Sequence, residues 1–163
     1  MSAWQPAYVG VGSNLDDPRA QVLHALDRLA MLPESRVVLR SPLYGSKPLG
    51  PVAQPDFVNA AVALLTQLDV GRFFAALREL ERELGRTPPR ERWGPRVIDL
   101  DLLAFGREQR LSAELTLPHP GIAQRNFVLY PLADIAAELE LPGVGRVAQL
   151  RARAPPAGLW VLP

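Results

Sequence analysis

The fold is organised around residues 91–105, which read ERWGPRVIDLDLLAF. Residues 97–103 of this stretch have the apolar character of a strand, which Asp99 and Asp101 interrupt. Residues i and i+2 of a strand point to the same side, about 6.5–7 Å apart along the chain, so the two aspartates share one face and the alternate apolar residues share the other. Two like charges side by side on a half-buried strand need a positive partner.

The positive partner of this aspartate pair has two possible sources. A solvated acidic edge would pair with Arg92 and Arg96, which stand just before the strand. A divalent metal would also neutralise the pair. The basic loop, broken by glycine and proline, favours the metal, because cations for phosphates beside carboxylates for Mg²⁺ form the layout that phosphoryl transfer needs.

Length and composition limit the class of protein. The chain has 163 residues, which predicts a single domain over residues 1–163 with a sizeable core. The net charge of +1 gives no global field for nucleic acid, so an anion site must be local. The absence of cysteine excludes disulfides, zinc–thiolate sites and cysteine nucleophiles. Neither a signal peptide nor a membrane-spanning run is evident, which predicts a cytoplasmic protein.

The pattern of apolar residues and turn signals predicts the order β-α-β-β-α-β. This is the ferredoxin-like arrangement of an α+β fold, with helices packed on a mainly antiparallel sheet. C-terminal additions should follow: a short hairpin at 107–117, a helical segment at 126–139 despite Pro131, and an irregular tail. The six core elements are expected at 7–13 (strand), 18–32 (helix), 36–44 (strand), 57–65 (strand), 69–85 (helix with its caps) and 97–105 (strand).

Local signals support the two predicted helices and the turn before the first. Asp17 and Pro18 form an N-cap and first-turn pair, Asp69 caps the second helix, and Gly85 is placed just after its end. The Gly10-x-Gly12 pair after the first strand lacks the third glycine of a dinucleotide fingerprint. We therefore interpret it as a tight strand-to-helix turn that would also let a flat ligand approach the backbone.

Four motifs together resemble one known family over most of the chain. They are GSNL (12–15), PLGPVAQPDFVNAAV (48–62), ERWGPRVIDLDLL (91–103) and LPHPGIAQRNFVLYPL (117–132). This set resembles the 6-hydroxymethyl-7,8-dihydropterin pyrophosphokinases of folate biosynthesis. The resemblance implies an α+β fold with a ferredoxin-like core. It also implies transfer of pyrophosphate from ATP to the pterin hydroxymethyl group, releasing AMP, with two Mg²⁺ ions and no covalent intermediate.

The resemblance assigns residues to the nucleotide and metal sites. Asp99 and Asp101 would hold both magnesium ions. Arg92 and Arg96 resemble triphosphate ligands and Arg86 a further loop arginine, since guanidinium forks match phosphate oxygens. The remaining nucleotide contacts implied by the resemblance are Glu81, Leu102, Thr116, His119 and Arg125. Taken alone, Glu81 on a helix would be an ordinary solvated carboxylate, and His119 would be a loop residue.

The pterin site follows a different logic, because a flat ring wants aromatic faces above and below and amide groups at its edge. Phe57 and Phe127 resemble the family's stacking pair, although core packing is the commoner role of phenylalanine. Asn59 can donate and accept at once, so it can bind the amide edge of the ring. The other pterin-site residues implied by the resemblance are Gly12, Ser46, Leu49 and Trp93. Residues 86–96, with Trp93, are expected to close over both substrates as a lid.

Two alternatives remain open on the sequence. A nucleotidyltransferase of the Gly-Ser plus Asp-x-Asp type would need Gly-Ser shortly before the carboxylates, but Gly12 and Ser13 lie far upstream. An RNA-recognition module shares the β-α-β-β-α-β order, but Asp99 and Asp101 on a sheet face would repel RNA phosphate. The expected partners are therefore the small molecules ATP and the pterin, with no nucleic acid, no membrane and a monomeric chain.

Overall fold

The computed structural model describes residues 3–85 and 97–163, and within these ranges the chain folds around one six-stranded antiparallel sheet. The strands lie in the order β10-β3-β4-β1-β5, and β2 also pairs with β4. They are β1 (Gln5–Ser13), β2 (Ser35–Arg40), β3 (Tyr44–Ser46), β4 (Phe57–Thr66), β5 (Asp99–Phe105) and β10 (Leu159–Val161). The predicted α+β class, with helices on an antiparallel sheet, is confirmed.

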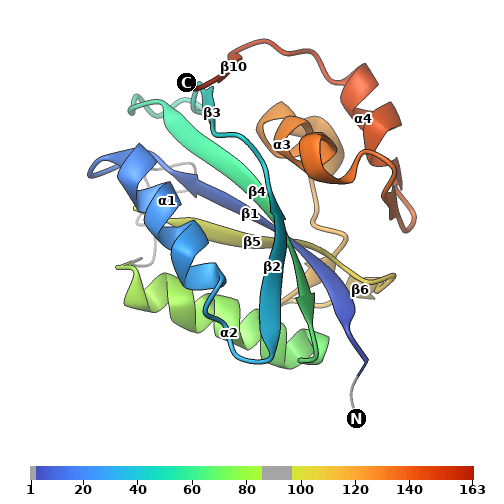
Figure 1. Cartoon of the computed structure of the whole chain (residues 1–163). Coiled ribbons are helices and arrows are strands. Elements are labelled where there is room, and N and C mark those ends of the chain that lie inside the picture. Colours follow the sequence, from blue (N-terminus) through green and yellow to red (C-terminus); the bar gives the residue numbers. More distant parts are fainter. Residues whose placement is uncertain (1–2, 86–96) are drawn as a thin grey trace.

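Helices cover both faces of this sheet (Figure 1). In the described ranges they are α1 (Pro18–Leu29), α2 (Val70–Glu83), α3 (Asn126–Ala136) and α4 (Val147–Arg153). Smaller elements connect them: the hairpins of β6 (Arg110–Leu111) with β7 (Thr116–Leu117) and of β8 (Glu140–Leu141) with β9 (Gly145–Arg146), and the 3-10 turn η1 (Ile122–Gln124). The hairpin and helix predicted after the last core strand are thus present.

The first face of the sheet is covered by α1 and α2. Alternate residues of β1, among them Val9 and Val11, pack there against Leu26 of α1 and Phe73 of α2, and all four are almost fully buried. The predicted caps are in place, because Asp17 accepts from the backbone of α1 and Asp69 from that of α2. Gly85 follows α2 with φ of 93°, a conformation that glycine adopts easily.

The second face is covered only in part. Helices α3 and α4 bury Leu103 of β5 together with Leu129, Leu132 and Leu150 in a second apolar cluster. This cluster does not include Gly10, Gly12, Asn59, Asp99 and Asp101, which lie on the same face of the sheet. Figure 1 shows α3 and α4 on the side of the sheet away from α1. None of the helices in residues 3–85 and 97–163 combines the length and apolarity that crossing a lipid bilayer demands.

The single strand predicted at 36–44 is wrong in one respect, because the structure divides it into β2 and β3. The break falls at Pro42, which has no N–H to donate to a strand ladder. Ser41 compensates at this point: its N–H donates to the Ala61 carbonyl at 2.9 Å and its hydroxyl oxygen accepts from the Ala61 N–H at 2.8 Å. Both halves therefore remain paired with β4.

The prediction of an irregular C-terminal tail is wrong. Residues 147–153 form α4, and Leu159–Val161 form β10 at the edge of the main sheet. The register joins Trp160 to Gly45 of β3. Prolines at 155 and 156 end the helix and leave an extended connection, so they separate the two elements without preventing either. The run Leu-Trp-Val was the available signal for a strand.

Candidate active site

A cavity of about 280 Å³ opens on the part of the second face that α3 and α4 leave uncovered. It is formed where β1, β3, β4 and β5 meet the beginning of α3. Its lining mixes glycine, alanine, aromatic and charged residues. They are Gly10, Val11, Gly12, Ser46, Lys47, Leu49, Phe57, Asn59, Ala60, Ala61, Asp99, Asp101, Leu103, Arg125, Phe127 and Val128.

Strand pairing places the two aspartates beside two glycines. Gly12 lies opposite Asp99 on β5 and opposite Asn59 on β4, and Gly10 lies opposite Asp101. Directly opposed residues in antiparallel strands point to the same face, so both carboxylates flank backbone that carries no side chain. The predicted common face of Asp99 and Asp101 is confirmed, and it is the face with the cavity.

The two glycines keep the floor of the cavity low. A Cβ at Gly12 would stand 3.2 Å from Oδ1 of Asn59, and one at Gly10 would stand 3.4 Å from Cδ2 of Leu103. A side chain at either position would therefore occupy space beside the aspartates, and one at Gly12 would also press on Asn59. The space above this backbone is therefore free for the close approach of a flat ligand that the sequence predicts.

A buried carboxylate anchors β5 between the two aspartates. Glu81 of α2 is only 3% exposed, and its Oε2 accepts from the N–H of Leu100 at 2.7 Å. Nε of Arg78 lies 3.1 Å from the other oxygen of Glu81, and the same guanidinium donates to the carbonyl of Leu100. The ordinary solvated carboxylate considered for Glu81 is thus wrong. Its position holds the edge of the strand that carries the aspartates.

The cavity has one aromatic side chain on each of two walls. Phe57 comes from the first residue of β4, and Phe127 comes from the first turn of α3. Both are half-buried, so part of each ring remains available to a ligand. Asn59 is buried at 5% exposure and donates from Nδ2 to Oγ of Ser46 at 2.7 Å. This hydrogen bond orients the amide in the wall of the cavity.

The donor set around the aspartates fits a magnesium ion. Within residues 3–85 and 97–163, no group of three or more histidine, cysteine, aspartate or glutamate side chains is arranged to hold a metal. Mg²⁺ commonly binds through only one or two carboxylates and completes its shell with water and substrate phosphates. Asp99 and Asp101 are such a pair, and Arg125 and Lys47 add positive charge to the same lining.

Comparison with known proteins identifies the family. The sequence matches, over residues 8–137, the family described as 7,8-dihydro-6-hydroxymethylpterin-pyrophosphokinase. The chain belongs to this family. A 2-amino-4-hydroxy-6-hydroxymethyldihydropteridine pyrophosphokinase of Pseudomonas aeruginosa is 47% identical over 159 residues, 98% of each chain. One of the same name from Haemophilus influenzae is 41% identical over 144 residues, 88% of this chain and 89% of the relative.

Solved structures share the fold at much lower identity. The HPPK-DHPS protein of Plasmodium falciparum, described as the A437G form with SDX-DHP, superposes with a TM-score of 0.74 at 14% identity. The match covers 94% of this chain but 46% of that longer one. The chain therefore spans under half the length of this structural neighbour, and the likeness concerns the fold alone.

Family membership settles the class of activity. The chain is a pyrophosphokinase, a diphosphotransferase of folate biosynthesis that acts on small molecules, and the co-substrate of its family is ATP. The pyrophosphokinase interpretation is thereby favoured over the nucleotidyltransferase and the RNA-recognition module that the sequence left open.

Most of the described site residues predicted from the sequence meet in the cavity. The structure brings together nine of them in its lining: Gly12, Ser46, Leu49, Phe57, Asn59, Asp99, Asp101, Arg125 and Phe127. The roles predicted for Arg86, Arg92, Trp93 and Arg96, and the predicted lid, lie outside the described residues.

Four predicted nucleotide contacts do not line the cavity: Glu81, whose burial against β5 is described above, Leu102, Thr116 and His119. Leu102 belongs to the apolar core under α1 and α2 and is only 2% exposed, so little of this residue is accessible to a ligand. Thr116 lies half-buried in the short hairpin of β6 and β7. His119 is held by its N–H, which donates to the carbonyl of Leu103 at 2.9 Å, and its buried Nδ1 lacks a hydrogen-bond partner among the described residues.

Sequence reasoning missed several residues that shape the site. Lys47, Ala60, Ala61 and Val128 line the cavity. Asn14 does not line it but is 1% exposed, and its Nδ2 donates at 2.9 Å to Oε1 of Gln54 and at 2.9 Å to the carbonyl of Pro55, which holds the segment leading into β4. A polar residue directly after a buried strand, within the GSNL motif, was the signal for Asn14.

Proposed function

We propose that the chain transfers the pyrophosphoryl group of ATP to the hydroxymethyl group of 6-hydroxymethyl-7,8-dihydropterin. The hydroxyl oxygen forms a bond to the β-phosphorus, the bond from that phosphorus to the α–β bridging oxygen breaks, and AMP leaves with the bridging oxygen. The observation that carries the proposal is a carboxylate pair beside a glycine floor, in a cavity with a phenylalanine on each of two walls.

The pterin would lie between Phe57 and Phe127, with its edge toward Asn59. A bicyclic ring fits a cavity of about 280 Å³, and its faces match two partly exposed phenyl rings. The amide of Asn59 is held by Ser46, so it presents a fixed pattern of donor and acceptor to the ring. On the family resemblance, we also assign contacts with the ring to Gly12, Ser46 and Leu49, which line the same cavity.

The triphosphate would lie at the aspartate end of the cavity. Asp99 and Asp101 are the residues we assign to two Mg²⁺ ions. Bound Mg²⁺ neutralises phosphate charge and favours in-line attack. Arg125, which directly precedes α3, adds positive charge to the lining of the cavity. Arg86, Arg92 and Arg96 are proposed as phosphate ligands on the family resemblance alone, as are the nucleotide roles of Glu81, Leu102, Thr116 and His119.

Direct transfer without a covalent enzyme intermediate is the mechanism we favour. The chain has no cysteine. Among the described residues that line the cavity, Ser46 carries the only hydroxyl, and that oxygen already accepts the hydrogen bond of Asn59. Histidine, the usual base beside a nucleophilic serine, is absent from the same lining.

The strand order supports a finer description of the fold. The predicted core has four strands along the chain: β1 is the first, β2 and β3 together are the second, β4 is the third and β5 is the fourth. Across the sheet these four strands lie in the order 4-1-3-2, which we interpret as ferredoxin-like. The segments after β5 are then C-terminal additions to a single domain of residues 1–163. The monomeric state and the cytoplasmic location remain predictions from the sequence.

The decisive experiment measures AMP release from ATP and Mg²⁺ with and without the hydroxymethyl pterin. We expect AMP and the pterin pyrophosphate in equal amounts, and none when a pterin without the hydroxymethyl group replaces the substrate. Release of ADP, or AMP formation that does not depend on the pterin, would contradict the proposal. Tight binding of single-stranded RNA in a filter assay would revive the RNA-recognition alternative.

A further inference from the structure

The C-terminal segment contacts both walls of the cavity. We call residues 154–161 the C-terminal clamp. On the first wall, β10 pairs with β3 so that Leu159 lies opposite Ser46, which lines the cavity. The N–H of Lys47 donates to the carbonyl of Gly158 at 2.9 Å, which extends this connection toward the loop that leads to Leu49. Figure 1 shows β10 alongside β3 at the edge of the sheet.

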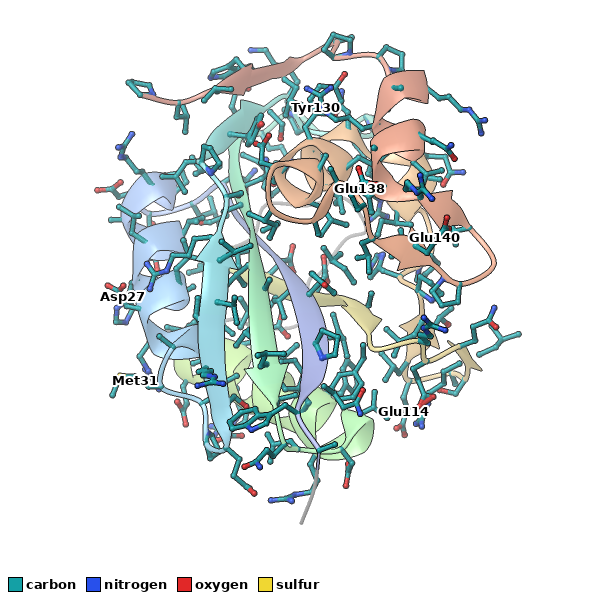
Figure 2. All side chains as sticks on the ribbon, turned by 45° about the vertical axis from the view of Figure 1, so that its right-hand side comes forward. Asp27, Met31, Glu114, Tyr130, Glu138 and Glu140 are labelled. Atoms are coloured by element: carbon teal, nitrogen blue, oxygen red, sulfur yellow. The ribbon has the colours of Figure 1, made fainter. Side chains whose placement is uncertain are left out.

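The second wall is joined to the same segment through α3. Nδ2 of Asn126 donates to the carbonyl of Pro155 at 2.9 Å and to that of Ala157 at 3.0 Å. The hydroxyl of Tyr130, one turn further along α3, donates to the carbonyl of Ala154 at 2.8 Å. Figure 2 places Tyr130 beside the C-terminal segment, which crosses the top of that view. Asn126 immediately precedes Phe127, the aromatic residue of this wall.

Trp160 of the clamp contacts β3, although 38% of the residue is exposed. Its indole lies over Gly45 so closely that a Cβ there would stand 2.3 Å from Cε2 of the ring. The ring also lies 5.6 Å from Nζ of Lys47, a cation–π contact to a residue of the cavity lining. Only glycine at position 45 allows this approach.

A direct link between the walls runs beneath the clamp. Tyr44 of β3 is 5% exposed, and its hydroxyl donates to Asp134 of α3. Burial and this hydrogen bond raise the pKa of Tyr44 to about 12, so the hydroxyl keeps its proton and remains a donor at neutral pH. The clamp and this link therefore connect the same two elements, β3 and α3, at different points.

From these contacts we propose that the C-terminal clamp sets the separation of the two walls that enclose the pterin, with Trp160 and Asn126 as positioning residues. The proposal rests on the proposed function, because it assumes that the ring lies between Phe57 and Phe127. The contacts of the clamp given above are to β3, to Lys47 and to α3. Its loss should therefore weaken pterin binding while nucleotide binding and the chemical step at saturating pterin change little.

The test on the first wall compares two tryptophans. Trp160→Ala should raise the Kd for the pterin about three- to tenfold, since a cation–π contact and its apolar packing are lost. The Kd for a nonhydrolysable ATP analogue should stay within about twofold. Trp160→Phe should restore most of the affinity. Trp4→Ala is the matched control, because Trp4 is also partly exposed and lies 4.8 Å from the guanidinium of Arg36, far from the cavity lining.

The test on the second wall uses Asn126→Asp. The carboxylate keeps the shape of the amide and suits the N-terminus of α3, so the helix should remain folded. It cannot donate to the carbonyls of Pro155 and Ala157, so the pterin Kd should rise as it does for Trp160→Ala. Gly45→Ala should have the same effect, because its Cβ displaces the indole. When Gly45→Ala is added to Trp160→Ala, the further rise in the pterin Kd should be much smaller than in the unmodified chain. This is the non-additivity expected of residues in contact.

Hydrogen exchange without any ligand separates the clamp from the proposed function. Exchange of residues 44–47 and 126–130 should quicken in Trp160→Ala and Asn126→Asp but not in Trp4→Ala. If the unmodified chain does not bind the pterin, the proposed function is wrong, and the exchange data alone then decide whether the clamp restrains the walls. If the pterin Kd and the hydrogen exchange are both unchanged in Trp160→Ala and in Asn126→Asp, the proposed role of the clamp is wrong. Equal losses of pterin and nucleotide affinity would also overturn it, because they indicate general disorder.

Discussion

The two faces of the central sheet are built from the same strands, but one face forms an apolar core and the other opens into the cavity. On β1, Val9 and Val11 enter the core under α1 and α2, whereas Gly10 and Gly12 leave the floor of a cavity on the other side. On the first face, β1 buries its apolar side chains in the core. On the second, the same strand gives up side-chain packing at two positions to make room.

The contrast is sharpest on β5. Leu100 is fully buried beneath the helices, while Asp99 and Asp101 on either side of it lie half-buried in the cavity. A carboxylate in such a place contributes no apolar burial and repels its neighbour. We therefore expect the packing under α1 and α2 to contribute more to stability than the part of the second face that carries the aspartates. Substitutions on the two faces should therefore have separable effects.

The largest effect is expected on the cavity face at Asp101. Asp101→Asn should lower turnover by a factor of about 10³ or more, because a lost metal ligand leaves triphosphate charge uncompensated by several kcal/mol. The free energy of unfolding should not fall, since one of two repelling charges is removed. AMP release and urea unfolding measure the two quantities. Asp27→Asn, at an exposed aspartate of α1, is the control (Figure 2). Near-normal turnover at saturating Mg²⁺ would show that Asp101 is not a metal ligand.

The complementary effect is expected on the core face at Leu64. This leucine of β4 is 1% exposed, so Leu64→Ala should lower the free energy of unfolding by about 2–5 kcal/mol. The pterin Kd and kcat of the folded molecules should remain close to those of the unmodified chain, because Leu64 points away from the cavity. Urea unfolding and steady-state kinetics below the unfolding midpoint provide the measurements. A selective loss of kcat would break the proposed separation of the faces.

A smaller effect separates the aromatic walls from core packing. Phe127→Ala should weaken pterin binding by about 1–3 kcal/mol, or roughly 5- to 150-fold, through lost stacking. Binding of a nonhydrolysable ATP analogue should change little, and calorimetry with each ligand tests both. Phe74 is a matched control, because it is partly buried on the helix-covered side. If Phe127→Ala weakens both ligands equally, Phe127 serves core packing rather than pterin binding.

The smallest effect is expected at the cavity floor. Gly12→Ala places a Cβ 3.2 Å from Oδ1 of Asn59, which should cost about one hydrogen bond to the pterin, roughly 0.5–1.5 kcal/mol or 2- to 13-fold in Kd. The free energy of unfolding should stay within about 1 kcal/mol of that of the unmodified chain. Alanine lowers the conformational entropy of the unfolded chain, which favours folding and offsets the crowding in the folded state. Unchanged pterin affinity would mean that the ring does not approach this backbone.

The sequence by itself determined the local features of this protein. Asp17, Asp69 and Gly85 mark helix ends through contacts within a few residues, and the structure has each of them in place. The common face of Asp99 and Asp101 follows from the period of two along a strand. The family motifs added the residues of the cavity, and nine of those predicted line it.

Only the tertiary structure decided how distant segments support that cavity. The burial of Glu81 against Leu100, the hold of Asn14 on the segment before β4, and the pairing of Trp160 with Gly45 all join residues far apart in the chain. No local periodicity encodes such partners, because a hydrogen-bonding group in a sequence is compatible with many acceptors until folding selects one. Local signals therefore marked where the chemistry lies, and long-range packing determined how its walls are held.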